Sequence, residues 1–232
     1  MPFNNTSPTL FLTDLYLLPI PEVDLAFAIN AASVKADDNF EKAKEVIKSI
    51  IDTYAMNKLR YGVVVFGSSA SIRVSFGDDF PTDENLKNVI TILSGSNERP
   101  ALDEALKKGK ELFDEAPERP NARKVLVFIT DMKSTSKLAD LKEAAKMLED
   151  DGIKVIPVAI GDEVDHVELE ETTSDKTNVV NVTTDVDVIV LKEKIMFNVF
   201  KGKCRKLAIN EMDRGPAKRG RGEGFYISLK GN

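Results

Sequence analysis

Two residues with oxygen-bearing side chains stand where apolar runs of the sequence end, and they are the first candidates for chemistry. Asn30 closes the run that begins at Val23, and Asp131 follows the run K-V-L-V-F-I-T over 124–130. Short apolar runs ended by turn formers are typical of strands buried on both faces of a parallel sheet. If the two strands lie side by side, Asn30 and Asp131 face each other at the carboxyl edge, where open α/β sheets bind ligands. The functional question is whether this edge holds a metal ion, since hard cations prefer oxygen ligands.

The elements that position these residues follow from the hydrophobic pattern. Besides the strands at 23–30 and 124–130, we expect strands at 61–67, 72–76, 154–160 and 178–182, and helices at 40–54, 86–93, 100–113, 138–148 and 187–200. Only four residues separate 61–67 from 72–76, too few for a crossover, so the later strand must be an antiparallel edge strand. The expected fold class is α/β, with a doubly wound, mostly parallel six-stranded sheet and helices on both faces.

Composition indicates one globular domain with extensions. The chain has 232 residues, of which 42% are hydrophobic and 30% charged. We expect a folded domain over 23–200, a flexible leader over 1–22 and a disordered, Gly-rich tail over 201–232. The tail carries nine Lys and Arg against three acids, whereas residues 1–200 carry 23 against 35. Because the basic tail lacks interleaved aromatic residues, we expect no nucleic-acid partner.

Signals for export are mixed. Residues 1–22 lack the basic start and the cleavage site of a signal peptide, so the chain taken at face value is not exported. No run approaches the roughly 20 apolar residues of a membrane span. Three sequons make Asn4, Asn5 and Asn181 glycosylation candidates if the chain enters the secretory route. The single cysteine, Cys204, excludes an internal disulfide framework and leaves a free thiol or an intermolecular bridge.

The sequence lacks the combinations of residues that common enzymatic mechanisms require. His166 is the only histidine, so neither a catalytic triad nor a His-rich metal site can be assembled. No glycine-rich fingerprint follows the first strand, and no P-loop is present. The acidic run 163–171 is interpreted as a solvated helix face, with a cation site as the alternative. We therefore expect no enzyme.

Several segments taken together resemble the von Willebrand factor type A (VWA) domain, in particular those of matrix and adhesion proteins of the collagen VI and matrilin type. The resemblance covers 23–200 and depends on landmarks in order: D-L-A-F-A-I from 24, N-F-E from 39, G-V-V-V-F from 62, A-L at 101, K-V-L-V-F-I-T-D from 124, G-I-K-V-I from 152 and A-I-G-D from 159. The fold that this resemblance implies is the one that the pattern of strands and helices predicts.

The resemblance also implies a metal-ion-dependent adhesion site, formed by D-x-S-x-S after the first strand, a Thr from a later loop and an Asp after the fourth strand. The corresponding positions of this chain are Asn30, Ala32, Val34, Glu98 and Asp131. Mg²⁺ needs about six oxygen ligands, yet Ala32 and Val34 supply no side-chain oxygen. Ser33 is one residue out of register and should point elsewhere, and the longer Glu98 should occupy the place of a partner's carboxylate. We expect no functional metal site and no cofactor, with residual Mg²⁺ binding as the alternative.

The function that this resemblance implies is a non-enzymatic protein-interaction or adhesion module of extracellular matrix type. It would bind a protein partner, such as the matrix protein collagen, without a bridging metal. The expected contact patch consists of Asn30, Ser33, Glu98 and Asp131. An intracellular, cytoplasmic scaffold or assembly factor of the same fold is the alternative, because no signal peptide is visible.

Overall fold

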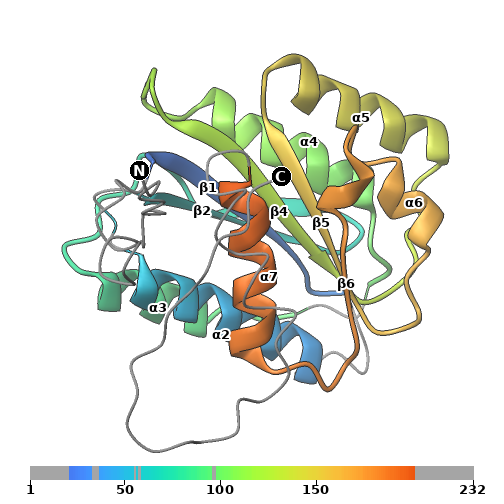
Figure 1. The fold of residues 1–232 in the computed structure, drawn as a ribbon, viewed down its shortest axis with the longest axis horizontal. Coiled ribbons are helices and arrows are strands. Elements are labelled where there is room, and N and C mark those ends of the chain that lie inside the picture. Colours follow the sequence, from blue (N-terminus) through green and yellow to red (C-terminus); the bar gives the residue numbers. More distant parts are fainter. Residues whose placement is uncertain (1–20, 33–36, 55, 57–58, 96–97, 202–232) are drawn as a thin grey trace, which may run out of the picture. The chain divides into compact units, whose positions relative to one another are not determined.

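The computed structural model describes residues 21–32, 37–54, 56, 59–95 and 98–201, which form a central sheet between two layers of helices (Figure 1). The six strands lie in the order β3-β2-β1-β4-β5-β6. Neighbouring strands are parallel except for the β2–β3 pair, which is antiparallel. This arrangement confirms the predicted fold class. The strands are β1 (Val23–Asn30), β2 (Leu59–Phe66), β3 (Ala70–Val74), β4 (Arg123–Thr130), β5 (Lys154–Ile160) and β6 (Val180–Val182).

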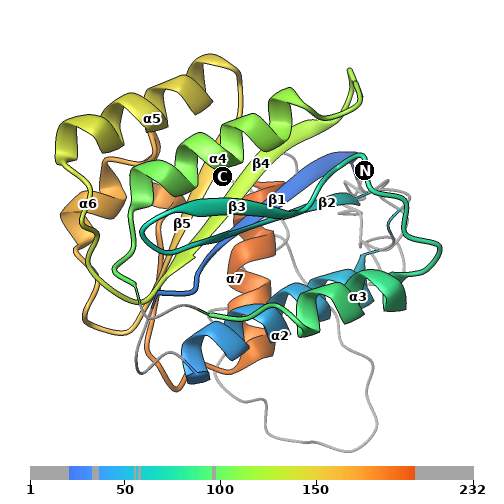
Figure 2. The ribbon, with the colours of Figure 1, turned by 180° about the vertical axis from the view of Figure 1, so that it is seen from behind.

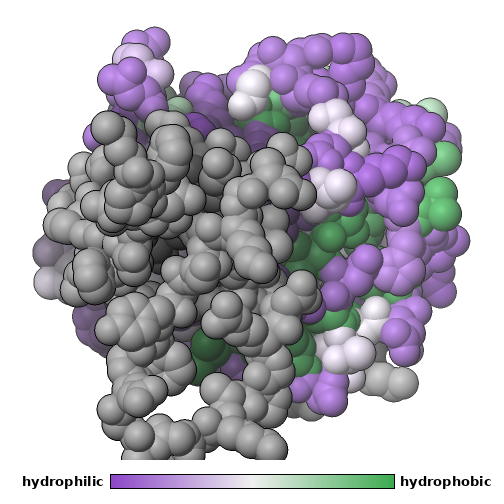
Figure 3. All heavy atoms as spheres, viewed as in Figure 1, coloured by the Kyte–Doolittle hydropathy of each residue, from purple (hydrophilic) through white to green (hydrophobic). Residues whose placement is uncertain are grey.

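The helices divide into two groups, one on each face of the sheet. Figures 1 and 2 show α2 (Asp37–Thr53), α3 (Asp83–Thr91) and α7 (Val188–Phe200) on one face. The other face carries α4 (Leu102–Asp114), α5 (Leu138–Asp150) and α6 (His166–Glu170). A short 3-10 turn, η1 (Lys176–Asn178), precedes β6. Over α5 and α6 the face seen in Figure 1 is mostly hydrophilic (Figure 3).

Alternation along β1 builds both hydrophobic cores. Leu25, Phe27 and Ile29 belong to the core under α2 and α7, and the small Ala26 and Ala28 belong to the core under α4. All five are fully buried, and burying a Leu, Ile or Phe side chain contributes about 1.5–3 kcal/mol. The two alanines leave little bulk between β1 and α4, which suits a closely packed helix.

Helix α4 approaches the sheet so closely that one of its positions requires glycine. A Cβ atom added to Gly109 would lie 2.7 Å from Cδ2 of Leu126 on β4, well inside van der Waals contact. Glycine at this position therefore lets α4 pack closely against Leu126 of β4.

Element boundaries differ from the sequence-based expectations at several ends. The prediction that Pro100 opens a helix was wrong, because α4 begins at Leu102 with Ala101 as its N-cap residue. The carbonyl of Pro100 instead accepts a 2.8 Å hydrogen bond from the backbone N–H of Thr135. The last strand is shorter than predicted, because residues 176–178 form η1 after the side chain of Asp175 accepts the N–H of Thr177. Residues 1–20 of the predicted leader over 1–22, and residues 202–232 of the predicted tail over 201–232, Cys204 included, lie outside the described residues.

Candidate functional site

The carboxyl edge of the sheet brings Asn30 and Asp131 together. Strands β1 and β4 are parallel neighbours with Ile29 opposite Ile129, so the residues that follow are adjacent as well. The Nδ2 atom of Asn30 donates to Oδ1 of Asp131 over 2.8 Å and to Oγ1 of Thr130 over 3.5 Å. The predicted juxtaposition of the two strand ends is therefore confirmed.

Asn30 is held in place on its acceptor side as well. Its Oδ1 atom accepts the backbone N–H of Ala32 over 2.9 Å, a short-range turn that Asn side chains commonly form. The residue is only 6% exposed, so its amide is occupied inside the protein. Burial without partners would cost a polar amide about 1–3 kcal/mol, and these bonds remove that cost.

A third polar residue at this edge, Asn39, is one that the sequence-based reasoning did not include in the site. Its Nδ2 atom, in the first turns of α2, donates to Oδ2 of Asp131 over 3.2 Å. The carboxylate of Asp131 thus accepts one amide N–H on each oxygen, from Asn30 on β1 and from Asn39 on α2. A polar residue at the start of the helix after β1 is the signal that could have indicated this contact.

The space enclosed at this edge is very small. Asn30, Asn39, Thr130 and Asp131 are among the residues that line a cavity of about 10 Å³, close to the minimum for one water molecule. Within the described ranges, no group of three or more His, Cys, Asp or Glu side chains is arranged to hold a metal ion. The described side chains that hydrogen-bond to Asp131 are neutral amides, which donate N–H groups to it.

Glu98 lies over the end of β2. Its Oε2 atom accepts the hydroxyl of Ser68 over 2.5 Å and the backbone N–H of Ser68 over 3.2 Å. The surrounding loop is attached to β2 by the N–H of Ala101, which donates to the carbonyl of Gly67 over 2.8 Å. Glu98 is exposed. In the described structure its carboxylate thus bonds to Ser68 at the neighbouring strand end, and its charge faces solvent.

The other predicted site residues differ in how far the structure describes them. Ala32 is buried beside the turn of Asn30. Asn181 is exposed on β6, so the third sequon is accessible. The remaining residues, Ser33, Val34, Asn4 and Asn5, lie outside the described residues.

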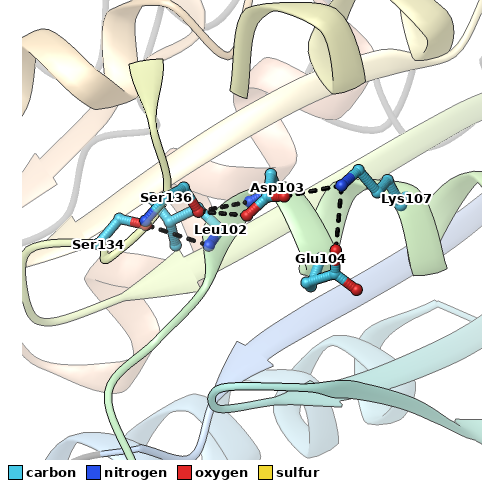
Figure 4. Close-up of polar contacts among 6 residues, drawn as sticks. All are labelled: Leu102, Asp103, Glu104, Lys107, Ser134 and Ser136. Carbon is cyan, nitrogen blue, oxygen red and sulfur yellow. Dashed lines mark hydrogen bonds and ion pairs between the residues drawn. The ribbon is translucent and has the colours of Figure 1, made fainter. Parts of the chain in front are cut away.

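The loop after β4, which is distant from α4 in the sequence, caps the N-terminus of this helix (Figure 4). Ala101 offers no side-chain cap, and two serines of the loop replace it. The Oγ atom of Ser134 accepts the N–H of Leu102 over 3.2 Å, and the Oγ atom of Ser136 accepts the N–H of Asp103 over 3.1 Å. These bonds satisfy N–H groups that a helix start leaves free. The loop that begins with Asp131 is thereby fixed to α4.

Charge reinforces this cap. The Asp103 carboxylate accepts a hydrogen bond from the hydroxyl of Ser136 and forms an ion pair with Lys107 at 2.8 Å. Burial by itself would raise the pKa of Asp103, but the hydrogen bonds from Lys107 and Ser136 outweigh it and hold the pKa below its usual value. The charged form of Asp103 is therefore the form that the fold favours.

The same loop also contacts α6. Lys133 forms a 2.8 Å ion pair with Asp165, the N-cap residue of α6, and the N–H of Ser134 donates to Oε2 of Glu168 over 3.2 Å. Burial raises the pKa of Glu168. His166, the first residue of α6, is exposed. Contacts on both sides therefore position the segment that carries Asp131.

Comparison with known proteins identifies the family. The sequence matches the von Willebrand factor type A domain over residues 24–193, so the chain belongs to this family. It is 27% identical to mouse collagen alpha-6(VI) chain over 185 residues, which are 78% of this chain and 8% of that protein. It is 30% identical to human matrilin-1 over 158 residues, which are 66% of this chain and 30% of matrilin-1. The chain therefore spans less than a third of the length of these relatives.

Solved structures show the same fold. Proximal thread matrix protein 1 from the mussel byssus superposes with a TM-score of 0.69 at 21% identity, covering 77% of this chain and 48% of the mussel chain. One structure of that mussel protein is described as having a zinc-occupied MIDAS motif. A von Willebrand factor type A protein from Catenulispora acidiphila gives a TM-score of 0.62 at 22% identity, covering 76% of this chain and 42% of the other. Among the described residues of this chain, no helix is both long and apolar enough to cross a membrane.

Proposed function

We propose that this chain is a non-enzymatic protein-binding module whose carboxyl edge recognises its partner without a bridging metal ion. The observation that carries the proposal is the bonding of Asp131, whose two carboxylate oxygens each accept an amide N–H, from Asn30 and from Asn39. In the metal-ion-dependent adhesion site that the family resemblance implies, the Asp after the fourth strand would face the ion. Here hydrogen bonds between protein groups replace that interaction.

The set of donors at the edge does not fit a divalent cation. Asn30 replaces the first carboxylate of the adhesion motif, and Ala32 and Val34 replace its two serines. Mg²⁺ takes a near-octahedral shell of about six oxygens and keeps several waters, whereas the cavity here has a volume of about 10 Å³. A metal would have to break the amide bonds to Asp131 and enlarge the cavity.

The chemistry that remains favours a partner with a basic side chain. The described hydrogen-bond donors to Asp131 are neutral amides, which add no positive charge beside its carboxylate, and exposed Glu98 adds a second acidic side chain at the same edge. The nearby cation Lys133 is offset by its ion pair with Asp165. A metal site would attract an acidic group of the partner, whereas this edge attracts a Lys or Arg. Buried Asn30 contributes by positioning Asp131.

Binding to immobilised collagen, measured by biolayer interferometry, tests this proposal. We expect equal affinity in millimolar Mg²⁺ and in chelator, and a loss of roughly tenfold or more, about 1.4 kcal/mol, for Glu98→Lys. Asp79→Lys is the matched control, since it makes the same change of charge at an exposed acid beyond the opposite end of β2. Binding that requires Mg²⁺, or that Glu98→Lys strengthens, would contradict the proposal.

The relatives also support an extracellular location, with the intracellular scaffold as the alternative. Collagen and matrilin chains are matrix proteins, and Asn181 of this chain is exposed within its sequon. Expression in a secreting animal cell line, followed by glycosidase treatment of the medium and of the cell lysate, distinguishes the two. A mobility shift that Asn181→Gln abolishes supports export, and an unglycosylated product retained in the cytosol supports the scaffold.

A further inference from the structure

A sizeable cavity among the described residues lies at the opposite, amino edge of the sheet. It has a volume of about 780 Å³. Residues near the starts of β1, β2, β4 and β5, the end of α4 with the loop that follows it, and Val199 of α7 line this cavity. Sites for small molecules commonly have volumes of 300–1,000 Å³. Arg123 and Lys154, from neighbouring strands, are part of its lining. The proposed function makes no use of this cavity.

Strand register places Arg123 and Lys154 on the same face of the sheet. Lys154 is the partner of Val125 across β4 and β5, and Arg123 precedes Val125 by two residues. Val125 belongs to the core under α2 and α7, so both cations lie on that face. The Nζ atom of Lys154 donates to the carbonyl of Asn198, in the last turn of α7, over 2.7 Å. The two cations therefore gather beneath the end of α7.

Arg123 has donors that the described part of the chain leaves unsatisfied. Its Nε and Nη2 atoms are buried, and neither finds an acceptor among the described residues. An unpaired buried donor costs about 1–3 kcal/mol, and more when it is charged. These two N–H groups form the edge of a guanidinium that bonds two oxygens of one oxyanion at once.

The local charge is also unbalanced. Burial, followed by the charges of Lys201 and Arg123, lowers the pKa of Lys154, and only Asp175 opposes this. Asp175 is already paired with Lys201 at 3.3 Å. At the same edge Arg60 has the buried carboxylate of Asp24 as its partner. An anion is thus the group that would complete the surroundings of Arg123 and Lys154.

We propose that this cavity binds one tetrahedral oxyanion, a sulfate or phosphate group carried by a small molecule, between Arg123 and Lys154. The Nε and Nη2 atoms of Arg123 and the Nζ atom of Lys154 provide at least three donors, and a tetrahedral oxyanion can present a separate oxygen to each of them. Asp24 in the lining is paired with Arg60 and Arg119. The other three acids of the lining, Asp114, Glu118 and Asp151, repel a long polyanion. The inference does not depend on the function proposed for the carboxyl edge.

Isothermal titration calorimetry at constant ionic strength tests the proposal with sodium phosphate, sodium sulfate and glucose 6-phosphate as probes. We expect saturable binding to the wild-type chain, and at least about tenfold weaker binding to Arg123→Gln and to Lys154→Gln, which is about 1.4 kcal/mol. Lys137→Gln, an exposed lysine outside the cavity, is the matched control and should bind as the wild type does. Tighter binding of glucose 6-phosphate than of phosphate would show that the group belongs to a larger molecule.

Further variants separate a binding role from a structural one. Arg123→Lys keeps the positive charge but loses the pair of donors, Nε and Nη2, so its affinity should lie between those of the wild type and Arg123→Gln. If Arg123→Gln does not fold, Arg123→Lys is compared with the wild type in its place. Three results would overturn the proposal. The first is equal binding heats in the wild type and all variants, and the second is binding of heparin but not of phosphate or sulfate. The third is that the wild-type chain binds no anion, while Arg123→Gln lowers the stability of the fold. The last result would mean that Arg123 only stabilises the end of α7.

Discussion

Two aspartates near opposite ends of the β1–β4 pair have very different partners. Asp24, at the amino edge, is 3% exposed and accepts two hydrogen bonds from Arg60, at 2.9 and 2.6 Å, and one from Arg119 at 2.8 Å. Asp131, at the carboxyl edge, accepts one N–H from each of Asn30 and Asn39. The first carboxylate is neutralised by cations, and the second is positioned by neutral groups.

This difference separates structure from recognition. A buried charge is stable only when it is paired and hydrogen-bonded, and the two arginines satisfy that requirement for Asp24. Half-buried Asp131 keeps its charge available, because amides orient it without cancelling it. The amino edge therefore holds the strand ends together, and the carboxyl edge offers a charge to a partner.

The largest expected effect comes from removing the charge at the amino edge. Asp24→Asn should lower the free energy of unfolding by about 3 kcal/mol, because it leaves Arg60 and Arg119 largely buried without their shared carboxylate. Urea denaturation followed by circular dichroism measures this loss. Asp114→Asn, which removes an exposed partner of Lys110, should cost less than about 0.5 kcal/mol. Equal losses in the two variants would refute the structural role of Asp24.

The same substitution at the carboxyl edge should cost much less. Among the described residues, Asp131→Asn leaves no cation without its ion-pair partner. Its main cost is that the new side-chain NH₂ group faces an amide N–H donor of Asn30 or Asn39. We expect a loss of about 1 kcal/mol in the free energy of unfolding, measured under the same denaturation conditions. A loss as large as that of Asp24→Asn would mean that both edges serve stability alike.

Ser136→Ala tests the cap that attaches the loop of Asp131 to α4. The variant loses the bond to the N–H of Asp103 and should be less stable by about 1 kcal/mol. Ser69→Ala, an exposed loop serine, is the control. An unchanged midpoint of denaturation in Ser136→Ala would show that the loop is held by other contacts.

Acid should reduce the effect of this cap. Because the pKa of Asp103 is lowered in the folded chain, its charge stabilises the fold at neutral pH. This stabilisation is lost as the pH falls below the ordinary aspartate value of 3.8 and through the lower folded value. The difference in stability between wild type and Ser136→Ala should therefore narrow in that range, whereas a difference that widens would contradict the assignment.

The smallest effect on stability is expected for Glu98→Gln. Glu98 is exposed and keeps a carbonyl oxygen for Ser68 after the change, so the free energy of unfolding should change by no more than about 0.5 kcal/mol. The variant is therefore suited to measuring partner binding without a change in fold. A loss of more than about 1 kcal/mol would show that Glu98 is mainly a structural residue.

Much of the architecture could be predicted because it depends on local patterns. The short link between the strands at 61–67 and 72–76 predicted the antiparallel edge, and the strand ends placed Asn30 beside Asp131. The contact of Asn39 does not follow from the strand pattern: its place at the start of the helix after β1 makes it a candidate, but the hydrogen bond depends on how α2 packs against the sheet. The capping of α4 by Ser134 and Ser136 joins residues more than thirty positions apart, and only tertiary structure brings them together.

The amino edge shows a second limit of sequence reasoning. The landmark at Asp24 indicated a buried strand, but nothing local indicated that Arg60 and Arg119 share its carboxylate. The same holds for Arg123, whose unsatisfied donors are recognised only once the end of α7 is placed. Burial of a charged group depends on all the elements that cover it, so the pattern of one strand does not reveal it.

Thermal melting in millimolar Mg²⁺ or Mn²⁺ against chelator tests the central claim most directly. A site with a dissociation constant near 10 μM would gain about 2.7 kcal/mol at 1 mM metal, a shift of several degrees. The account predicts no shift for the wild-type chain, and a shift for a variant with the adhesion motif restored by Asn30→Asp, Ala32→Ser, Val34→Ser and Glu98→Thr. A rise of several degrees in the wild-type chain would contradict it.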